Sequence, residues 1–226
     1  MNCDRLAPWY RLLEYGALGR ALERRRTEFL EQVGDCRRAL LLGDGDGRFA
    51  AALVTRHREV RVVSVEQSEG MLRCARRRLD ALSIAAAERA QFVQADVGVW
   101  LRNLSSTAAS GEGSQAPFDL VATHFFFDCF SAAELAPLIA VITARTSPGA
   151  CWLVSEFRQP AGRGWPAWHA WVWLRVLYAF FRMTTGLRVA RLADHRPLLA
   201  AQGFVLEREI TARAGLLASE SWRRRE

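Results

Sequence analysis

The sequence G-D-G-D-G at residues 43–47 directly follows the short apolar run A-L-L-L at residues 39–42. The apolar run, with turn-forming residues after it, predicts a buried strand, and residues 49–56 predict the helix that follows. Glycines between a strand and a helix allow the backbone to approach a ligand closely. The stretch therefore predicts a strand, a ligand-binding loop and a helix in succession.

Strands and helices alternate beyond this loop. β-branched and apolar runs predict strands, and apolar residues spaced three and four apart predict helices. The predicted strands are 60–65, 90–95, 118–123 and 150–157, and the predicted helices are 68–82, 131–144 and two within 9–33. Residues 105–117 predict a surface loop, and residues 147–149 predict a turn. The alternation predicts a parallel sheet that helices cover on both faces.

Two of these helices begin with capping signals. Ser68 is a predicted N-cap, because a serine oxygen can accept a hydrogen bond from the first turn of a helix. The residues from Ser131 to Glu134 have the S-x-x-E form of a capping box.

Unusual polar residues follow the predicted strands. Glu66 follows the second strand, Asp96 the third, residues 124–128 the fourth, and the glycine loop the first. Parallel sheets bind ligands beyond the carboxyl ends of their strands, near the switch point beside the first strand. We therefore expect these residues at one edge, where Glu66 can accept both hydroxyls of a ribose and Asp96 an adenine amino group.

The loop excludes two common nucleotide-binding motifs. The Walker pattern G-x-x-x-x-G-K-[ST] does not occur in the sequence. The dinucleotide fingerprint G-x-G-x-x-G also fails, because its third glycine would fall at Arg48 rather than at Gly47. Asp44 and Asp46 would repel a pyrophosphate, but they suit a ligand that carries an ammonium and a sulfonium.

The chain resembles the class I S-adenosylmethionine-dependent methyltransferases over residues 8–222, in the motifs A-L-L-L-G-D-G-D-G, V-V-S-V-E, V-Q-A-D, F-D-L-V-A-T-H and S-P-G-A-C-W-L-V-S-E. The resemblance implies a Rossmann-like α/β fold with a seven-stranded, mostly parallel sheet, helices on both faces and a C-terminal antiparallel hairpin. That hairpin is expected at about 204–212 and 214–222, after a last helix within 198–204. The resemblance also implies a single domain over 1–226, with an N-terminal helical cap at about 8–33 and an aromatic helical insertion at about 162–190.

The resemblance implies S-adenosylmethionine as the cofactor and a set of residues that bind it. These residues are Gly43, Asp44, Gly45, Asp46, Gly47, Glu66, Gln67, Asp96, Val97 and Thr123. The family usually has an acid two residues before the first glycine, where this chain has Leu41. We therefore expect Asp46 to hold the ammonium of the cofactor.

The stretch T-H-F-F-F-D-C-F, residues 123–130, lies where the family places residues that face the methyl acceptor. It lacks the Asn/Asp-Pro-Pro-Tyr signature of enzymes that act on amide or base nitrogens, so no nucleic acid is expected. It also lacks the acid cluster of magnesium-dependent types, so no metal is expected. His124 and Asp128 are the candidate catalytic groups, with a structural histidine and a capping acid as the alternatives. The residues expected on the substrate side are Tyr10, Phe125, Phe126 and Trp168.

An aromatic stretch, residues 165–181, holds four of the eight tryptophans. It is too short at 17 residues to span a membrane, and Arg175 at its middle would cost about 2.5–3.5 kcal/mol there. A helix that is aromatic on all sides must be covered by the domain, a partner chain or lipid. The alternatives are a packed lid, a homodimer helix, or a wall for a hydrophobic substrate with peripheral membrane contact.

Charge and cysteine content set wider limits. The net charge is +7, mostly from arginine, which permits contact with nucleic acid, anionic lipid or an acidic substrate but identifies none of them. The five cysteines include no CxxC pair, which predicts reduced thiols in a cytoplasmic protein.

Together, these features predict methyl transfer from S-adenosylmethionine to a small, hydrophobic or aromatic acceptor. The segment D-R-L-A-P-W-Y also gives a weak similarity to quinone-biosynthesis methyltransferases. Two alternatives stay open: an enzyme that uses the same cofactor for another reaction, and a non-catalytic partner subunit that binds the cofactor.

Overall fold

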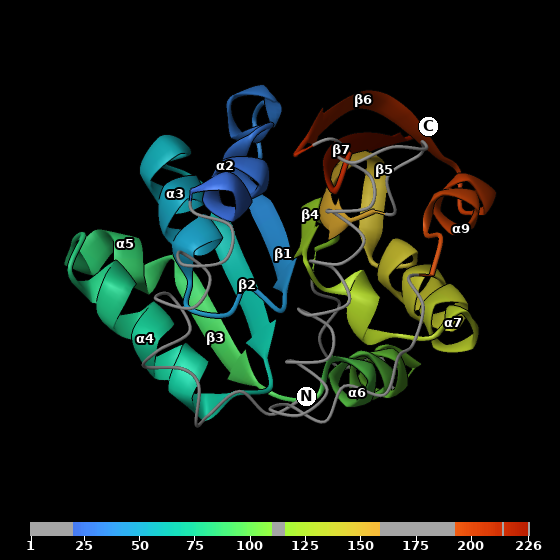
Figure 1. Ribbon diagram of the computed structural model, residues 1–226. Helices are drawn as coiled ribbons and strands as arrows, with labels where there is room; N and C mark the ends of the chain where they lie inside the picture. The colour runs from blue at the N-terminus through green and yellow to red at the C-terminus, as the bar shows by residue number, and fades with distance from the viewer. Residues whose placement is uncertain (1–19, 110–115, 159–192, 214, 226) are drawn as a thin grey trace.

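The computed structural model describes residues 20–109, 116–158, 193–213 and 215–225. Within these residues, seven strands form one sheet in the order β3-β2-β1-β4-β5-β7-β6 (Figure 1). The strands are β1 Arg38–Leu42, β2 Arg61–Glu66, β3 Ala90–Gln94, β4 Phe118–His124, β5 Thr146–Phe157, β6 Phe204–Ala212 and β7 Leu217–Arg224. The first five strands are parallel and β7 is antiparallel to both β5 and β6, so the predicted fold is confirmed.

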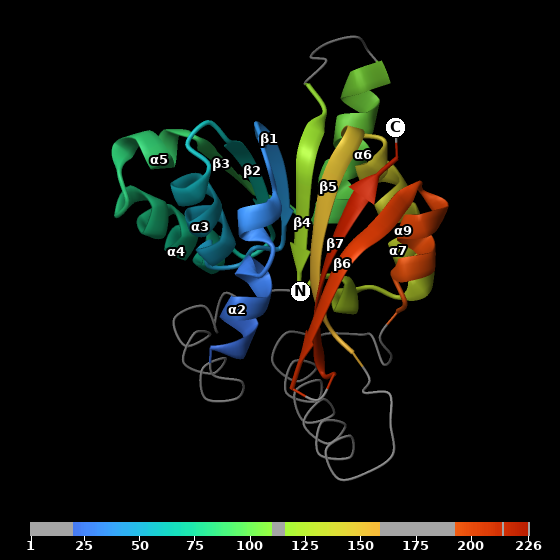
Figure 2. The ribbon, with the colours of Figure 1, turned by 90° about the horizontal axis from the view of Figure 1, so that it is seen from above.

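Helices cover both faces of this sheet. They are α2 Ala21–Thr27, α3 Arg48–Arg56, α4 Glu69–Asp80, α5 Ile84–Glu88, α6 Val97–Ala109, α7 Ala132–Thr143 and α9 Arg196–Ala201, with short 3₁₀ helices η1 Leu30–Gln32 and η2 Phe127–Cys129. Figure 2 shows α2 to α5 on one side of the sheet and α6, α7 and α9 on the other.

Each face of the sheet has its own apolar core, because successive residues of a strand point to opposite faces. In β1, Ala39 and Leu41 pack with α3, α4 and α5, whereas Leu40 and Leu42 pack with α6 and α7. All four residues are at most 1% exposed, as expected of a central parallel strand. Leu41, which replaces the acid usual in the family, is therefore a core residue.

Both predicted capping signals are confirmed. The Ser68 hydroxyl accepts a hydrogen bond of 3.2 Å from the Met71 amide at the start of α4. At the start of α7, the Ser131 hydroxyl accepts from the Glu134 amide, and the Glu134 carboxylate accepts from the Ser131 amide at 2.9 Å. These bonds satisfy amides that a helix start leaves unpaired.

Three local predictions were wrong or incomplete. Residues 105–109 belong to α6 rather than to a loop, because alanine favours the helix and the loop-forming glycines begin only at Gly111. The predicted turn at 147–149 lies inside β5, where the pairing with β4 shifts register between Phe118 and Leu120. Such a bulge accommodates Pro148, which has no N–H, and Gly149, whose φ is +73°. The short helix α5 was not predicted.

Several predictions fall on residues that the structure does not describe. Tyr10, Trp168, the aromatic stretch 165–181 and residues 8–19 of the helical cap lie outside the described ranges. Among the described residues, no helix is long and apolar enough to cross a membrane. The cysteines within the described ranges are free thiols, namely Cys36, Cys74, Cys129 and Cys151.

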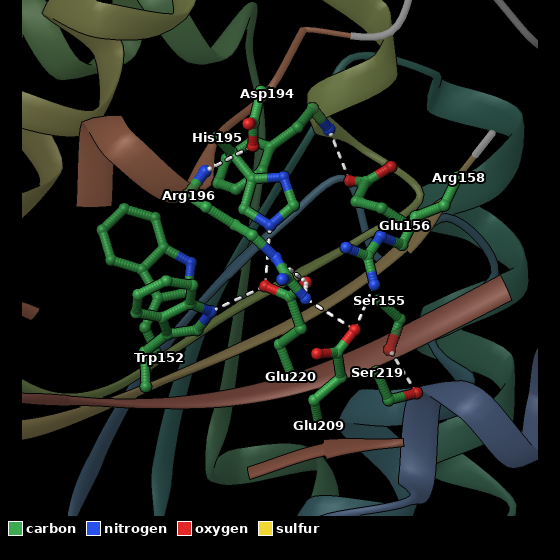
Figure 3. A network of polar contacts seen from close by, with 12 residues as sticks. Trp152, Ser155, Glu156, Arg158, Asp194, His195, Arg196, Glu209, Ser219 and Glu220 are labelled. Carbon is green, nitrogen blue, oxygen red and sulfur yellow. Dashed lines mark hydrogen bonds and ion pairs between the residues drawn. The ribbon is translucent and has the colours of Figure 1, made fainter. Parts of the chain in front are cut away.

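A buried polar network joins the start of α9 to the C-terminal hairpin (Figure 3). Glu220 of β7 lies at its centre, with a side chain that is 2% exposed. Its Oε1 accepts from the Arg196 guanidinium at 2.7 and 2.9 Å. Its Oε2 accepts from the Trp222 indole at 2.8 Å and lies 2.8 Å from His195 Nε2. The charge of Glu220 is thus neutralised inside the protein.

The same network includes both chain segments that flank residues 159–192. Arg158, before that stretch, is paired with Glu209 of β6. Arg196, after the stretch, also contacts Glu209, at 2.6 Å, as well as Glu220. The hairpin carboxylates therefore hold the two flanking segments close together, as Figure 3 shows.

We predict that Glu220→Gln destabilises the protein more at neutral pH than in acid. Burial raises the pKa of Glu220, but its bonds to His195, Arg196 and Trp222 outweigh burial and lower the pKa to about 2. Because the pKa is lower in the folded state, the stabilisation is complete above about pH 4.5 and is lost as the pH falls toward 2. The shift corresponds to stabilisation on the order of 3 kcal/mol.

Urea unfolding near pH 7 and near pH 3 measures this difference. The matched control is Glu207→Gln, which removes the partner of Arg223 in an ion pair at the surface of the hairpin. An equal loss of stability for Glu220→Gln at both pH values would contradict the prediction.

Candidate active site

The carboxyl ends of the central strands form the edge that carries the candidate site. The Gly43 amide, just after β1, donates to the Val65 carbonyl of β2 at 3.0 Å. The Phe125 amide, just after β4, donates to the Ser155 carbonyl of β5 at 2.6 Å. The loops after β1 and β4 therefore leave the sheet side by side, at the switch point of the strand order.

The glycine loop depends on its glycines. Gly43, Gly45 and Gly47 have φ values of +68°, +64° and +76°, a region that other residues rarely adopt. A Cβ on Gly43 would lie 2.6 Å from the Phe126 ring, and one on Gly47 would lie 2.6 Å from Ala75 Cβ of α4. A Cβ on Gly45 would meet nothing within 4 Å. The two outer glycines thus pack against protein, and the middle one faces open space.

The two loop aspartates have partners within the protein. Both carboxylate oxygens of Asp44 accept from amides of the first turn of α3, those of Phe49 at 3.3 Å and Ala50 at 2.9 Å. Burial raises the pKa of Asp44 to about 7, although the bond from Ala50 opposes this shift. Asp46 is 8% exposed and pairs with the guanidinium groups of Arg48, at 2.9 Å, and Arg78, at 2.8 Å.

The acids after β2 and β3 lie at the same edge. Glu66 Oε1 accepts from the Ser68 amide at 2.9 Å. Burial raises the pKa of Glu66, and amide hydrogen bonds from Ser68 and from Gly45 of the glycine loop oppose the shift. Asp96 is exposed and caps α6, its Oδ1 accepting from the Val99 amide at 3.1 Å.

Two further predicted cofactor residues directly follow these acids. Gln67, after Glu66, is exposed. Val97, after Asp96, is the first residue of α6 and is buried in the apolar core. Thr123 is fully buried in β4, and its hydroxyl accepts from the Trp152 indole at 3.0 Å.

His124, the last residue of β4, is 6% exposed. Neither ring nitrogen has a hydrogen-bond partner among the described residues. The ring meets Phe49 of α3 edge-on, with 4.6 Å between centroids. Burial lowers the pKa of His124 to about 3, and the positive charge of Arg26 contributes to the shift, so the imidazole is neutral at physiological pH.

The turn after His124 brings three predicted site residues together. Phe125 has a φ of +55°, which strains a residue with a side chain, and its ring lies under the Arg26 guanidinium at 5.2 Å. Phe126 packs on Gly43 and contacts the Phe130 ring. Asp128 lies in η2, half-buried. The turn thus borders the glycine loop.

Glu156 was not predicted as a site residue. It lies near the end of β5, is 3% exposed, and accepts through Oε1 from the amides of Phe126 at 2.9 Å and Phe127 at 2.8 Å. The sequence gives only a weak signal for it, a charged residue inside an otherwise apolar strand end, A-C-W-L-V-S-E-F. Its partners come from a different strand end and become visible only in the structure.

The residues at this edge fit the predicted cofactor. Gly45 leaves open space above the loop, and its amide and the carboxylate of Glu66 are adjacent. A carboxylate there can accept from ribose hydroxyls, while the exposed Asp96 can accept from an adenine amino group. Among the described residues, no group of three His, Cys, Asp or Glu side chains is placed to hold a metal ion.

Comparison with known families agrees with this geometry. Residues 39–149, from β1 into β5, match the model of a methyltransferase domain family. This match identifies residues 39–149 as part of a methyltransferase domain. S-adenosylmethionine is therefore the cofactor, as the sequence predicted.

Solved structures share the fold of the methyltransferase domain. An O-methyltransferase family protein from Burkholderia thailandensis is 17% identical, with a TM-score of 0.66 over 98% of this chain and 62% of its own. An O-methyltransferase family 2 protein from Planctomyces limnophilus, in complex with apigenin, is 15% identical, with a TM-score of 0.67 over 99% of this chain and 62% of its own. The magnesium protoporphyrin IX methyltransferase from Synechocystis, with bound S-adenosylhomocysteine, is 15% identical, with a TM-score of 0.59 over 90% of this chain and 81% of its own.

These identities show a common fold and nothing finer. The chain spans less than two thirds of the length of the two O-methyltransferases. No curated protein matches the chain.

We predict that Gly47→Ala destabilises the methyltransferase domain more than Gly34→Ala does. Both glycines have similar positive φ values, +76° and +72°, so the backbone strain is the same, about 1–2 kcal/mol. Only Gly47 faces a neighbour, Ala75, so its variant adds a steric cost of about 1–3 kcal/mol. Urea unfolding of both variants measures the difference, and equal losses would show that α4 yields to the added methyl group.

Proposed function

We propose that the protein transfers a methyl group from S-adenosylmethionine to a small, hydrophobic or aromatic acceptor. The observation that carries this proposal is the shared edge of the cofactor loop and the β4 turn, where the ring of Phe126 packs directly on Gly43. This contact brings the turn that we assign to the methyl acceptor next to the loop that we assign to the cofactor. The structural neighbour in complex with apigenin, an aromatic molecule, supports the acceptor class.

On the cofactor side, the chain provides a cradle of backbone and carboxylate groups. Gly43, Gly45 and Gly47 shape the loop, and Glu66 accepts from the ribose hydroxyls while Asp96 accepts from the adenine amino group. Gln67, Val97 and Thr123 complete this proposed set. Asp44 and Asp46 are the proposed partners of the ammonium, although each carboxylate also accepts from α3 amides or from arginines.

On the acceptor side, Asp128 is the candidate base that we favour over His124. The bound cofactor supplies an electrophilic methyl group, so the protein has to position the acceptor, exclude water and receive a proton. The lowered pKa of His124 makes its imidazole a weak base. The unpartnered nitrogens of His124 suit a hydrogen bond to a ligand. The half-buried Phe125 provides apolar surface, whereas Phe126 belongs to the buried core.

Partners and location depend on segments beyond the described residues. Contacts of Tyr10 and Trp168 with the acceptor, a homodimer, and peripheral membrane contact through 165–181 stay predictions, as does a cytoplasmic location. The charge gives no support for a nucleic-acid partner, since no aromatic and basic binding patch accompanies it in the sequence.

We predict that Glu66→Gln weakens S-adenosylmethionine binding by at least about tenfold, because a charged acceptor for the ribose hydroxyls is lost. Glutamine keeps an oxygen for the Ser68 amide, so the local fold is preserved. Calorimetric titration with S-adenosylmethionine, S-adenosylhomocysteine and NAD measures the affinities, with Glu207→Gln as the control. An unchanged affinity would exclude the ribose contact, and tight NAD binding would exclude the cofactor assignment.

We predict that Asp128→Asn lowers methyl transfer by about a hundredfold, and His124→Gln by about tenfold. Transfer of labelled methyl groups to a panel of phenols measures both rates. Because the pKa of His124 lies near 3, the rate should show no histidine inflection between roughly pH 5 and 8. The reverse order of the two losses, or such an inflection that disappears in His124→Gln, would make His124 the base.

A further inference from the structure

The Glu156 carboxyl group is only half satisfied by the protein. Oε1 accepts both amide hydrogen bonds from the turn after β4, from Phe126 and Phe127. Oε2 is buried and has no hydrogen-bond partner among the described residues. Burying a polar atom without a partner costs free energy, and such atoms are rare in folded proteins. The unpartnered Oε2 therefore indicates a ligand that forms a hydrogen bond with it.

The surroundings of Glu156 favour its protonated form. Burial raises its pKa well above the usual range, and the negative charges of Asp128 and Glu220 raise it further, although the two amide bonds oppose the shift. A protonated carboxyl group keeps one oxygen as an acceptor, which Oε1 provides for the amides. The proton then resides on Oε2, which becomes a hydrogen-bond donor.

Charged and titratable groups approach Glu156 from three elements. From η2 come Asp128 and the half-buried Cys129, whose raised pKa keeps it a neutral thiol. From β7 comes Glu220, already neutralised by His195 and Arg196 of the α9 start. The His195 ring also packs on Phe127, 5.3 Å between centroids. Figure 3 shows Glu156 and this neighbouring network, in which no described cation pairs with Oε2.

We infer that Glu156 recognises the methyl acceptor by donating a hydrogen bond from Oε2 to one of the acceptor's oxygens. This inference rests on the proposed function, with Asp128 receiving the proton of the hydroxyl to be methylated. Glu156 then offers a neutral hydrogen-bond donor, and the Asp128 carboxylate offers a hydrogen-bond acceptor. Together they match a molecule whose phenolic or enolic hydroxyl lies next to a carbonyl. The acceptor class thus narrows from aromatic molecules in general to hydroxy-carbonyl compounds.

A purely structural role of Glu156 would not explain why its Oε2 is buried without a hydrogen-bond partner among the described residues. Holding the turn requires only the two bonds to Oε1, and these bonds also support the strained φ of Phe125 at the same turn. Two variants separate the roles. Glu156→Gln keeps an accepting oxygen and a donor but does not titrate, whereas Glu156→Leu removes both.

Infrared spectroscopy of the whole protein near neutral pH tests the protonation state. We expect the carbonyl stretch of a buried carboxylic acid, and we expect Glu156→Gln to remove it while Glu207→Gln does not. A spectrum in which Glu156→Gln removes only carboxylate absorption would overturn the inference, because an ionised Glu156 has no proton to donate.

Binding of salicylamide, with benzamide as the analogue that lacks the hydroxyl, tests recognition. Saturation-transfer NMR on protein loaded with S-adenosylhomocysteine should show salicylamide binding in the wild type and in Glu156→Gln, and about fivefold weaker binding in Glu156→Leu. As the pH rises, the wild type should lose affinity relative to Glu156→Gln. Equal affinities of all three proteins, or a constant ratio across pH, would overturn the inference.

Calorimetric titration with S-adenosylmethionine keeps this test separate from that of the proposed function. Glu156→Gln should bind the cofactor as the wild type does, because it keeps the oxygen that accepts from the Phe126 and Phe127 amides. Loss of cofactor binding in Glu156→Gln would show that Glu156 acts only by holding the fold. Absence of binding in the wild type would instead defeat the proposed function.

Discussion

The parallel pairing of β1 with both β2 and β4 is the constraint on which the candidate site depends. It places the loops after β1 and β4 at the same edge and on either side of the switch point. Backbone bonds such as those of Gly43 to Val65 and of Phe125 to Ser155 set the height at which each loop leaves the sheet. The close packing of Phe126 on Gly43 then follows from the register rather than from either loop alone.

Local sequence patterns predicted most of the fold. The features that the sequence did not predict depend on contacts between residues far apart in the chain. The apolar run before Gly43 and the capping signals at Ser68 and Ser131 depend on neighbouring residues, so they predicted elements correctly. The bulge at 147–149 depends on the register between β5 and β4. The role of Glu156 depends on an amide that lies thirty residues away in the sequence. The presence of acids at the edge was predictable, whereas their partners were not.

Several arginines bond to the backbone of the protein itself. Every cation other than histidine is an arginine, and a guanidinium can bridge several oxygens at once. Arg78 bonds both the backbone carbonyl and the carboxylate of Asp46, Arg89 bonds the carbonyls of Val54 and His57, and Arg224 that of Thr143. These arginines hold loops and strand ends in place, so their charge has a structural role.

The pairing of Arg158 and Arg196 with one carboxylate of the hairpin has a consequence for how such a chain can vary. The ion pairs to Glu209 hold the two flanking segments close together. The entropic cost of closing the connection between them rises only slowly with the number of residues inserted. A segment of different length or composition can be exchanged at this point without altering the sheet. Changes in the length of this connection can thus accumulate independently of the glycine loop.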